Sequence, residues 1–99
     1  MNMQSLMAQA QRMQRDLENK KNELKQMEFK GVSEWVELTF NGDKTIKDVK
    51  ILKDGIIEED DKEILADMFQ IAQKDAFKKI DEETSKKLGK FAGPMDGLF

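Results

Sequence analysis

The chain has 99 residues, a net charge of −3 and neither Cys nor His, and charged residues make up 37% of it. This length fits one domain with a modest core, so we expect a single domain over residues 1–99. A chain without Cys has no disulfides or thiolate metal sites, and one without His lacks the commonest general base at neutral pH. No Gly-rich phosphate-binding loop occurs either. We therefore expect no enzyme activity, no cofactor and no metal.

The first predicted element is a long helix over residues 2–27, a segment rich in the helix-favouring residues Gln, Met, Leu, Lys and Glu. Apolar residues recur at steps of three and four, with Lys20 as the one polar break, which places them in a stripe along one side of the helix. The stripe consists of Met3, Leu6, Ala10, Met13, Leu17, Leu24 and Met27.

The length of this helix indicates self-association. As one helix it would span about 39 Å, which exceeds the roughly 35 Å diameter of a compact domain of this size. Packing of the stripe in the chain's own core is one interpretation, and a dimer seam over at least part of its length is another, for which a second copy is the simplest source of cover. The two are compatible, since one end can pack inward while the other meets a partner. A membrane surface is a third alternative, which the absence of Trp from this helix and its few Leu residues disfavour.

Two strands joined by a hairpin follow the helix. Val36, Leu38 and Phe40 alternate with polar residues, which is the pattern of a half-buried strand. The next pair, Asn41-Gly42, predicts a type I′ turn. The second strand places Val49 and Ile51 on one face.

Two further features complete the predicted sheet. Ile46 does not fit the alternation of the second hairpin strand, which predicts a bulge or a late strand start near Thr45. Residues 28–32 are predicted to form a third strand, because a two-stranded ribbon alone is marginally stable. The sequence thus predicts a three-stranded antiparallel sheet in an α+β fold whose helices cover one sheet face.

An acidic segment precedes the second long helix. Between Asp54 and Asp67 there are seven acidic residues and a single basic one. The spacing does not match a calcium-binding loop, so we interpret the carboxylates as a helix start that begins at Asp60 or Asp61, with a side chain capping the first turn. Ile56 and Ile57 are predicted to form an apolar plug before it.

The second helix is predicted to end at Gly89, and residues 89–99 are expected to form a flexible tail. Its apolar face is wide and consists of Ile64, Leu65, Met68, Phe69, Ile71, Ala72, Ala76, Phe77 and Ile80.

Basic residues are concentrated on the two long helices, where they repeat at helical spacing. No aromatic residue stands among those of the first helix, and Phe77 of the second belongs to its apolar face. This disfavours base stacking and leaves phosphate contacts without base readout as the chemistry the basic residues could supply. The solvated surface of an ordinary helix is the alternative interpretation. The candidate phosphate-binding residues are Arg12, Arg15, Lys21, Lys25, Lys74, Lys78, Lys79 and Lys86, and the candidate dimer or core seam comprises Leu6, Met13, Leu17, Leu24, Val36, Leu38 and Phe40.

Several segments, in order, resemble the YbaB/EbfC family of bacterial nucleoid-associated proteins. These are residues 6–14 (LMAQAQRMQ), 36–42 (VELTFNG), 49–51 (VKI), 59–65 (EDDKEIL) and 81–84 (DEET). The resemblance implies a homodimer whose protruding long helices clamp duplex DNA with low to moderate sequence preference, in the bacterial cytoplasm. It also implies DNA contacts on the first helix and, through the lysines of the second, on the C-terminal helix.

Two function classes follow from these patterns. The first is a dimeric, nucleoid-associated protein that binds duplex DNA and has a role in nucleoid organisation or gene regulation. The second is a dimeric adaptor or accessory subunit that uses its apolar stripe and the apolar tail residues Phe91, Met95 and Phe99 to engage another protein, without DNA contact.

Overall fold

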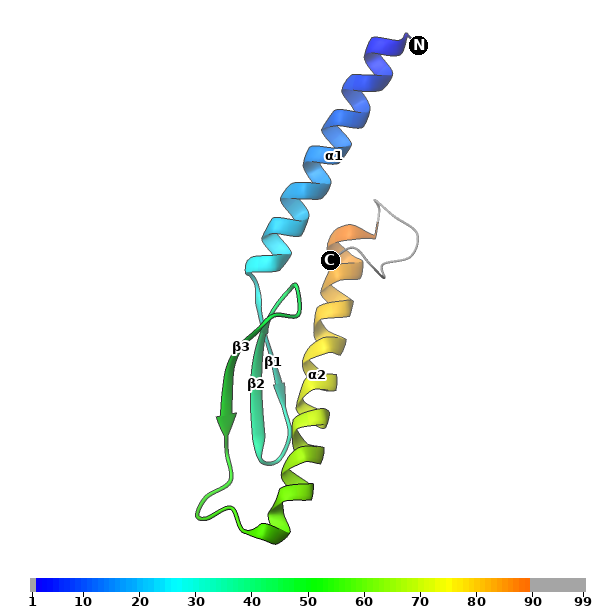
Figure 1. Ribbon diagram of the computed structural model, residues 1–99. Helices are drawn as coiled ribbons and strands as arrows, with labels where there is room; N and C mark the ends of the chain where they lie inside the picture. The colour runs from blue at the N-terminus through cyan, green and yellow to red at the C-terminus, as the bar shows by residue number, and fades with distance from the viewer. Residues whose placement is uncertain (1, 90–99) are drawn as a thin grey trace.

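The computed structural model describes residues 2–89, which form two long helices and a three-stranded sheet (Figure 1). In chain order, the elements are α1 (Met3–Gln26), β1 (Glu28–Val32), β2 (Val36–Asn41), β3 (Ile46–Ile51), a short 3₁₀ helix (Glu59–Asp61) and α2 (Lys62–Leu88). The predicted α+β order is confirmed, including the third strand and the end of α2 at Gly89. The predicted tail lies outside the described residues.

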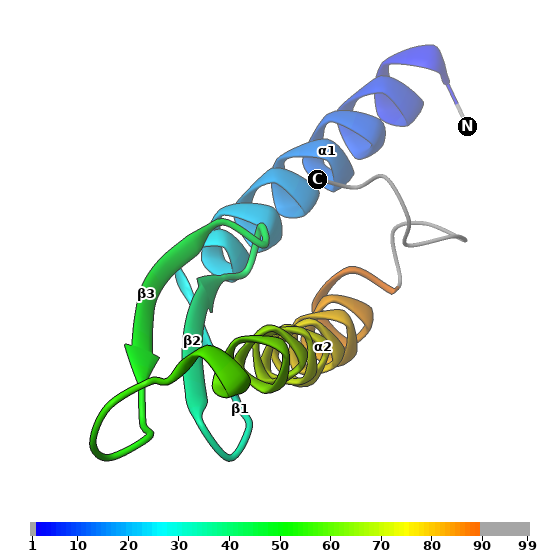
Figure 2. The same cartoon turned by 60° about the horizontal axis from the view of Figure 1, so that its bottom comes forward.

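The molecule is a rod rather than a globule. Its principal extents are 70 × 20 × 16 Å and its radius of gyration is 19.0 Å, whereas a compact domain of about 100 residues has a radius of gyration of about 13 Å. α1 projects away from the body that the sheet and α2 form (Figures 1 and 2). The expectation that both helices cover the sheet was therefore wrong, and α2 alone covers it.

The sheet is antiparallel, with the order β1-β2-β3 and one face turned toward α2. Val36, Leu38 and Phe40 of the central strand alternate onto this face, and each is at most 5% exposed. They pack against the small residues Ala72 and Ala76 of α2, with Ile80 nearby. The alternation that predicted β2 therefore supplies the centre of the core.

Gly31 lets α2 lie close to β1. A Cβ atom at this position would be 1.9 Å from the carbonyl oxygen of Ala72 and 2.7 Å from the Cβ of Ala76. Both distances are far below van der Waals contact, so any side chain would force the helix away from the strand. The glycine that weakens β1 as an isolated strand is thus the residue that permits its packing.

A second glycine fixes the base of the projecting helix. The Gly42 N–H donates to the Met27 carbonyl at 3.1 Å, and a Cβ at Gly42 would be 1.9 Å from the Leu24 carbonyl oxygen. Leu24 is the one buried residue of α1. The C-terminal turn of α1 is therefore held against the β2–β3 hairpin, while the rest of the helix extends outward.

The hairpin turn differs from the predicted type I′ turn. Lys44 has a φ of 68°, and it is the single non-glycine residue with positive φ among residues 2–89, so neither Asn41 nor Gly42 has the conformation that a type I′ turn needs. The Lys44 N–H donates to the Asn41 carbonyl at 2.9 Å, and the Asn41 N–H donates to the Thr45 carbonyl at 2.8 Å. These bonds close a three-residue loop.

The predicted bulge near Thr45 is confirmed. Phe40 pairs with Ile46, and its neighbour Thr39 pairs with Asp48 rather than with Lys47. Lys47 is therefore the additional residue. The bulge brings Ile46 onto the same sheet face as Val49.

Two predictions for the segment before α2 were wrong. Ile56 is 79% exposed, so it does not form an apolar plug. Asp61 makes no side-chain bond to the first turn of α2, and its carboxylate instead accepts the preceding Glu58 N–H at 3.0 Å. This bond, helped by the Lys53 ammonium, lowers the pKa of Asp61.

Neither α1 nor α2 has the length and apolar character that crossing a membrane requires, over the residues described.

Candidate nucleic-acid interface

The projecting part of α1 is exposed along nearly its whole length. The Asn2 side chain caps its first turn by accepting the Ser5 N–H at 2.8 Å, which satisfies one of the N–H groups left free at a helix start. From Met3 to Asp16 every side chain is exposed. The Arg12 and Arg15 side chains therefore reach solvent.

Charge is distributed unevenly along the rod. α1 carries five basic and three acidic residues and lies at one end of the long axis. The acidic segment from Asp54 to Asp67 lies at the opposite end, where the chain enters α2 (Figure 1). A polyanion would be attracted to the α1 end and repelled from the other.

The lysines of the hairpin and the following loop are all paired with carboxylates of the same chain. Lys44 lies 3.1 Å from Asp81, Lys50 lies 3.7 Å from Glu37 and Lys53 lies 3.3 Å from Asp61. Lys47 pairs with Glu28. Except for the partly buried Lys53–Asp61 pair, these pairs are largely exposed and contribute little to stability. All four partly neutralise the positive charge on this side of the molecule.

The long helices carry most of the basic residues without an intrachain partner. Among residues 2–89, eight basic side chains have no carboxylate oxygen within 4.0 Å, and seven of them lie on α1 or α2. The eight are Arg12, Arg15, Lys21, Lys25, Lys30, Lys74, Lys78 and Lys86. Apart from Lys30 on β1, this set consists of residues that the sequence selected as phosphate-binding candidates.

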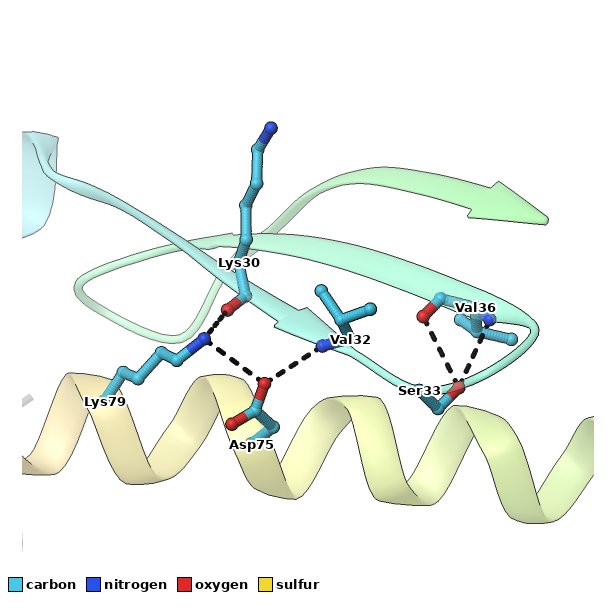
Figure 3. Close-up of polar contacts among 6 residues, drawn as sticks. All are labelled: Lys30, Val32, Ser33, Val36, Asp75 and Lys79. Carbon is cyan, nitrogen blue, oxygen red and sulfur yellow. Dashed lines mark hydrogen bonds and ion pairs between the residues drawn. The ribbon is translucent and has the colours of Figure 1, made fainter. Parts of the chain in front are cut away.

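Lys79, the remaining candidate, is exposed but bonded to other groups of the same chain (Figure 3). Its ammonium donates to the Lys30 carbonyl at 2.7 Å and to the Asp75 carboxylate at 3.2 Å. Asp75 also accepts the Val32 N–H at 3.0 Å, and this bond, with the ammonium of Lys79 adding to it, lowers the pKa of Asp75. Lys79 and Asp75 together occupy backbone groups on the free edge of β1, which is a structural role.

The candidate seam divides into two groups. Leu24, Val36, Leu38 and Phe40 are buried within the chain itself. Leu17 is partly buried, and the side chains nearer the α1 tip are exposed, with Leu6 at 45% and Met13 at 52%. The structure therefore gives Leu24 and the β2 residues of the seam a role in the core, and it leaves the α1 residues nearer the N-terminus uncovered.

A second uncovered apolar surface lies on β3 and consists of Ile46, Val49 and Ile51, which we name the β3 strip. These residues pair with core residues of β2 and so share their sheet face, yet they are 45–52% exposed. The reason is that α2 packs against β1 and β2 and makes no contact with β3. Strand alternation placed Val49 and Ile51 on one face, but no signal in the sequence shows that α2 stops short of them.

Among residues 2–89, no three acidic side chains gather in a way that could hold a metal ion. What the described surface offers is an elongated helix with unpaired cations and two exposed apolar strips, a combination suited to binding a polyanion and to association. Fold and surface together define a small α+β protein with a projecting basic helix.

Comparison with known proteins identifies the family. Residues 1–95 match the model of the YbaB/EbfC DNA-binding family, so the chain belongs to this family. The expected resemblance is thereby confirmed. Since the family consists of DNA-binding proteins rather than enzymes, the expectation of a non-enzymatic protein is confirmed as well.

Two relatives are similar in sequence over nearly the whole chain, and one solved structure shares the fold. The chain is 42% identical over 97 residues to a nucleoid-associated protein of Streptococcus uberis, covering 96% of this chain and 97% of that one. It has the same identity and coverage with a nucleoid-associated protein of Streptococcus pyogenes. The crystal structure of an uncharacterized protein from Helicobacter pylori has the same fold, with a TM-score of 0.78 and 21% identity over 94% of this chain and 99% of that one.

Proposed function

We propose that the protein is a homodimer that binds duplex DNA mainly through phosphate contacts from the unpaired cations of α1 and α2. The observation that carries the proposal is the division of the basic residues. Those of the hairpin and its following loop are paired within the chain, and those without a partner lie almost entirely on the two long helices.

Phosphate binding follows from the physical chemistry of these side chains. Each Lys or Arg that neutralises a phosphate releases condensed counterions, which favours binding at low salt and does not depend on base sequence. Arg12 and Arg15 lie three residues apart, and Lys21 and Lys25 lie four residues apart, so each pair shares a helix side. The affinity is therefore expected to be strongly salt-dependent and only weakly sequence-dependent.

The exposed β3 strip supports dimerisation. Burying an aliphatic side chain completely is worth about 1.5–3 kcal/mol, and these three are about half exposed, so covering them would contribute roughly 2–4 kcal/mol per protomer. The exposed part of the α1 stripe adds to this. A second copy would cover these surfaces and set two basic arms at a fixed separation.

The biological setting is inferred from the relatives. The two streptococcal proteins are named as nucleoid-associated, and the chain is collinear with them over nearly its full length. We extend this role to the present protein, as a DNA-binding component of the bacterial nucleoid within the cytoplasm. The contribution would be to nucleoid organisation or to gene regulation.

A gel-shift titration of a duplex at two salt concentrations, with light scattering of the free protein, tests the proposal. For 6–10 phosphate contacts, the affinity should fall by about 10³–10⁵ between about 50 and 200 mM salt. The free protein should have twice its monomer mass of 11.5 kDa. Absence of duplex binding at low salt would contradict the DNA proposal, and a monomer at micromolar concentration would contradict the dimer.

The exposed apolar surfaces also support a second candidate, a dimeric adaptor for another protein. Leu6 and Met13 on the α1 tip and Ile56 in the acidic loop are exposed by 45–79%. A pull-down from lysate treated with nuclease separates the two functions. A protein partner remains after nuclease treatment, whereas partners bridged by DNA are lost.

A further inference from the structure

The side of α1 opposite its apolar stripe carries a regular series of amides, interrupted by one arginine. Gln4, Gln11, Arg15, Asn22 and Gln26 follow one another at steps of seven, four, seven and four residues, which keeps them on one side of the helix. All five side chains are exposed. We name this series the amide seam.

The N-terminal end of this seam cannot bind DNA through charge. Residues 2–11 contain no charged side chain, although they form the part of α1 that extends furthest from the body. Amides are weak ligands for phosphate but good ligands for base edges. Gln and Asn can bond the N6 and N7 atoms of adenine with two hydrogen bonds, and Arg can donate two hydrogen bonds to the O6 and N7 atoms of guanine.

Unpaired cations flank the seam on both sides. A helical residue advances by about 100°, which places Arg12 about 80° to one side of the line through Gln4, Gln11 and Arg15. Lys25 and Lys21 lie about 60° and 100° to the other side of that line. None of these three cations has a carboxylate within 4.0 Å among the described residues.

This arrangement matches the cross-section of the DNA major groove. The groove is about 12 Å wide and admits an α-helix, with base edges on its floor and a phosphate backbone along each wall. A helix lying in the groove therefore needs polar, uncharged side chains facing the floor and cations facing both walls. The amide seam and its flanking cations supply these in the required order.

Glu18 adds a separate argument. It lines a surface hollow together with Gln11, Gln14 and Arg15, and it has no basic partner within 4.0 Å among residues 2–89. A carboxylate beside Arg15 would be repelled by a phosphate wall. On the floor of the groove it can accept a hydrogen bond from the cytosine amino group.

We infer that α1 enters the major groove and that Gln4, Gln11 and Arg15 contact base edges, which gives the protein a sequence preference. The inference rests on the proposed DNA binding and goes beyond it, since phosphate contacts supply affinity for every duplex and the seam distinguishes among duplexes. The apolar stripe lies on the opposite side of α1. A second copy can therefore cover it without blocking the seam.

Selection from a duplex pool with a randomised centre tests the inference, followed by titration of the selected duplex and a scrambled duplex at one salt concentration. The test variant is Gln11→Ala. The matched control is Gln9→Ala, which removes an exposed amide from the same uncharged segment but lies about 140° from Gln4, away from the seam. Neither substitution changes the net charge, and alanine preserves the helix.

The wild type should bind the selected duplex more tightly than the scrambled one. Gln11→Ala should reduce this ratio by about fivefold or more, as expected for loss of a two-bond base contact, while binding to the scrambled duplex stays unchanged. Gln9→Ala should keep the full ratio.

Three results would overturn the inference. If the wild type enriches no sequence, or if Gln11→Ala weakens binding to both duplexes equally, base reading by the seam is wrong and the phosphate clamp still stands. If no duplex binds at low salt, the proposed function fails and the inference fails with it.

Discussion

The position of the basic residues, rather than their number, should determine DNA binding. Two variants that each replace four basic residues with glutamine test this, because both change the net charge from −3 to −7. The first removes the unpaired cations of α1 at Arg12, Arg15, Lys21 and Lys25. The second removes the paired lysines of the hairpin region at Lys44, Lys47, Lys50 and Lys53.

The expected magnitude follows from counterion release. Each neutralised phosphate contributes about 0.9 to the slope of log affinity against log salt. The three cations that face the groove walls, Arg12, Lys21 and Lys25, therefore contribute about 2.7 per protomer and about 5 per dimer, and raising the salt concentration fourfold costs a factor of about 40 for the three contacts of one protomer. The slope of the α1 variant should fall by up to about 5, and the slope of the hairpin variant should stay close to the wild-type slope.

Fluorescence anisotropy of a labelled duplex, measured at four or more salt concentrations, gives the slope for each variant. Far-UV circular dichroism and the light-scattering mass should stay at wild-type values, since none of the eight side chains is buried. If the two variants lose equal slope, net charge rather than the placement of cations controls binding, and the proposed arms are wrong.

Three other predictions concern the fold and the dimer. Val49→Glu should reduce the light-scattering mass to that of a monomer, because it puts a charge in the β3 strip; an unchanged mass would mean that the dimer uses another surface. Gly31→Ala should lower the free energy of unfolding by about 1–3 kcal/mol in urea titrations, since its Cβ would lie 1.9 Å from the Ala72 carbonyl oxygen, whereas Lys30→Ala should change it by less than about 0.5 kcal/mol. The pKa of Asp75 is lowered in the fold, so its stabilisation is present above its unfolded pKa and is lost as pH falls through the folded pKa. The stability difference between the wild type and Asp75→Asn should therefore shrink below about pH 4, and a constant difference would refute the assignment.

The sequence predicted the elements of the fold well because each has a strong local signal. The three-and-four spacing of α1, the alternation of Val36, Leu38 and Phe40, and the stop at Gly89 are properties of adjacent residues. Even the bulge at Lys47 followed from a single break in alternation. Such patterns arise from side-chain geometry within one element and need no knowledge of its neighbours.

The incorrect predictions concern contacts between elements. Asn41-Gly42 has the composition of a type I′ turn, yet Gly42 is needed where the hairpin meets the end of α1, and the left-handed conformation moves to Lys44. The exposure of Ile56 likewise depends on a loop path that no local pattern encodes. Tertiary packing overrides local preference at such positions.

For the candidate site, the sequence identified the basic residues but could not show which were already paired. The Lys47–Glu28 and Lys44–Asp81 pairs join residues 19 and 37 positions apart, so they become visible only in the fold. The same holds for Lys79, whose bond to the Lys30 carbonyl joins residues 49 positions apart. The structure thus shows which basic residues have intrachain partners, which charge and helical spacing alone could not show.

Photo-crosslinking from single cysteines tests most directly whether the α1 arm contacts DNA. The chain has no cysteine, so Gln14→Cys on α1 and Asp54→Cys in the acidic loop each provide one attachment site for a photoreactive probe. The probe on α1 should crosslink a duplex at low salt, with a yield that falls as salt rises, and the probe at the opposite end should give almost no product. Equal crosslinking from both positions, or crosslinking from the acidic loop alone, would contradict the proposed interface.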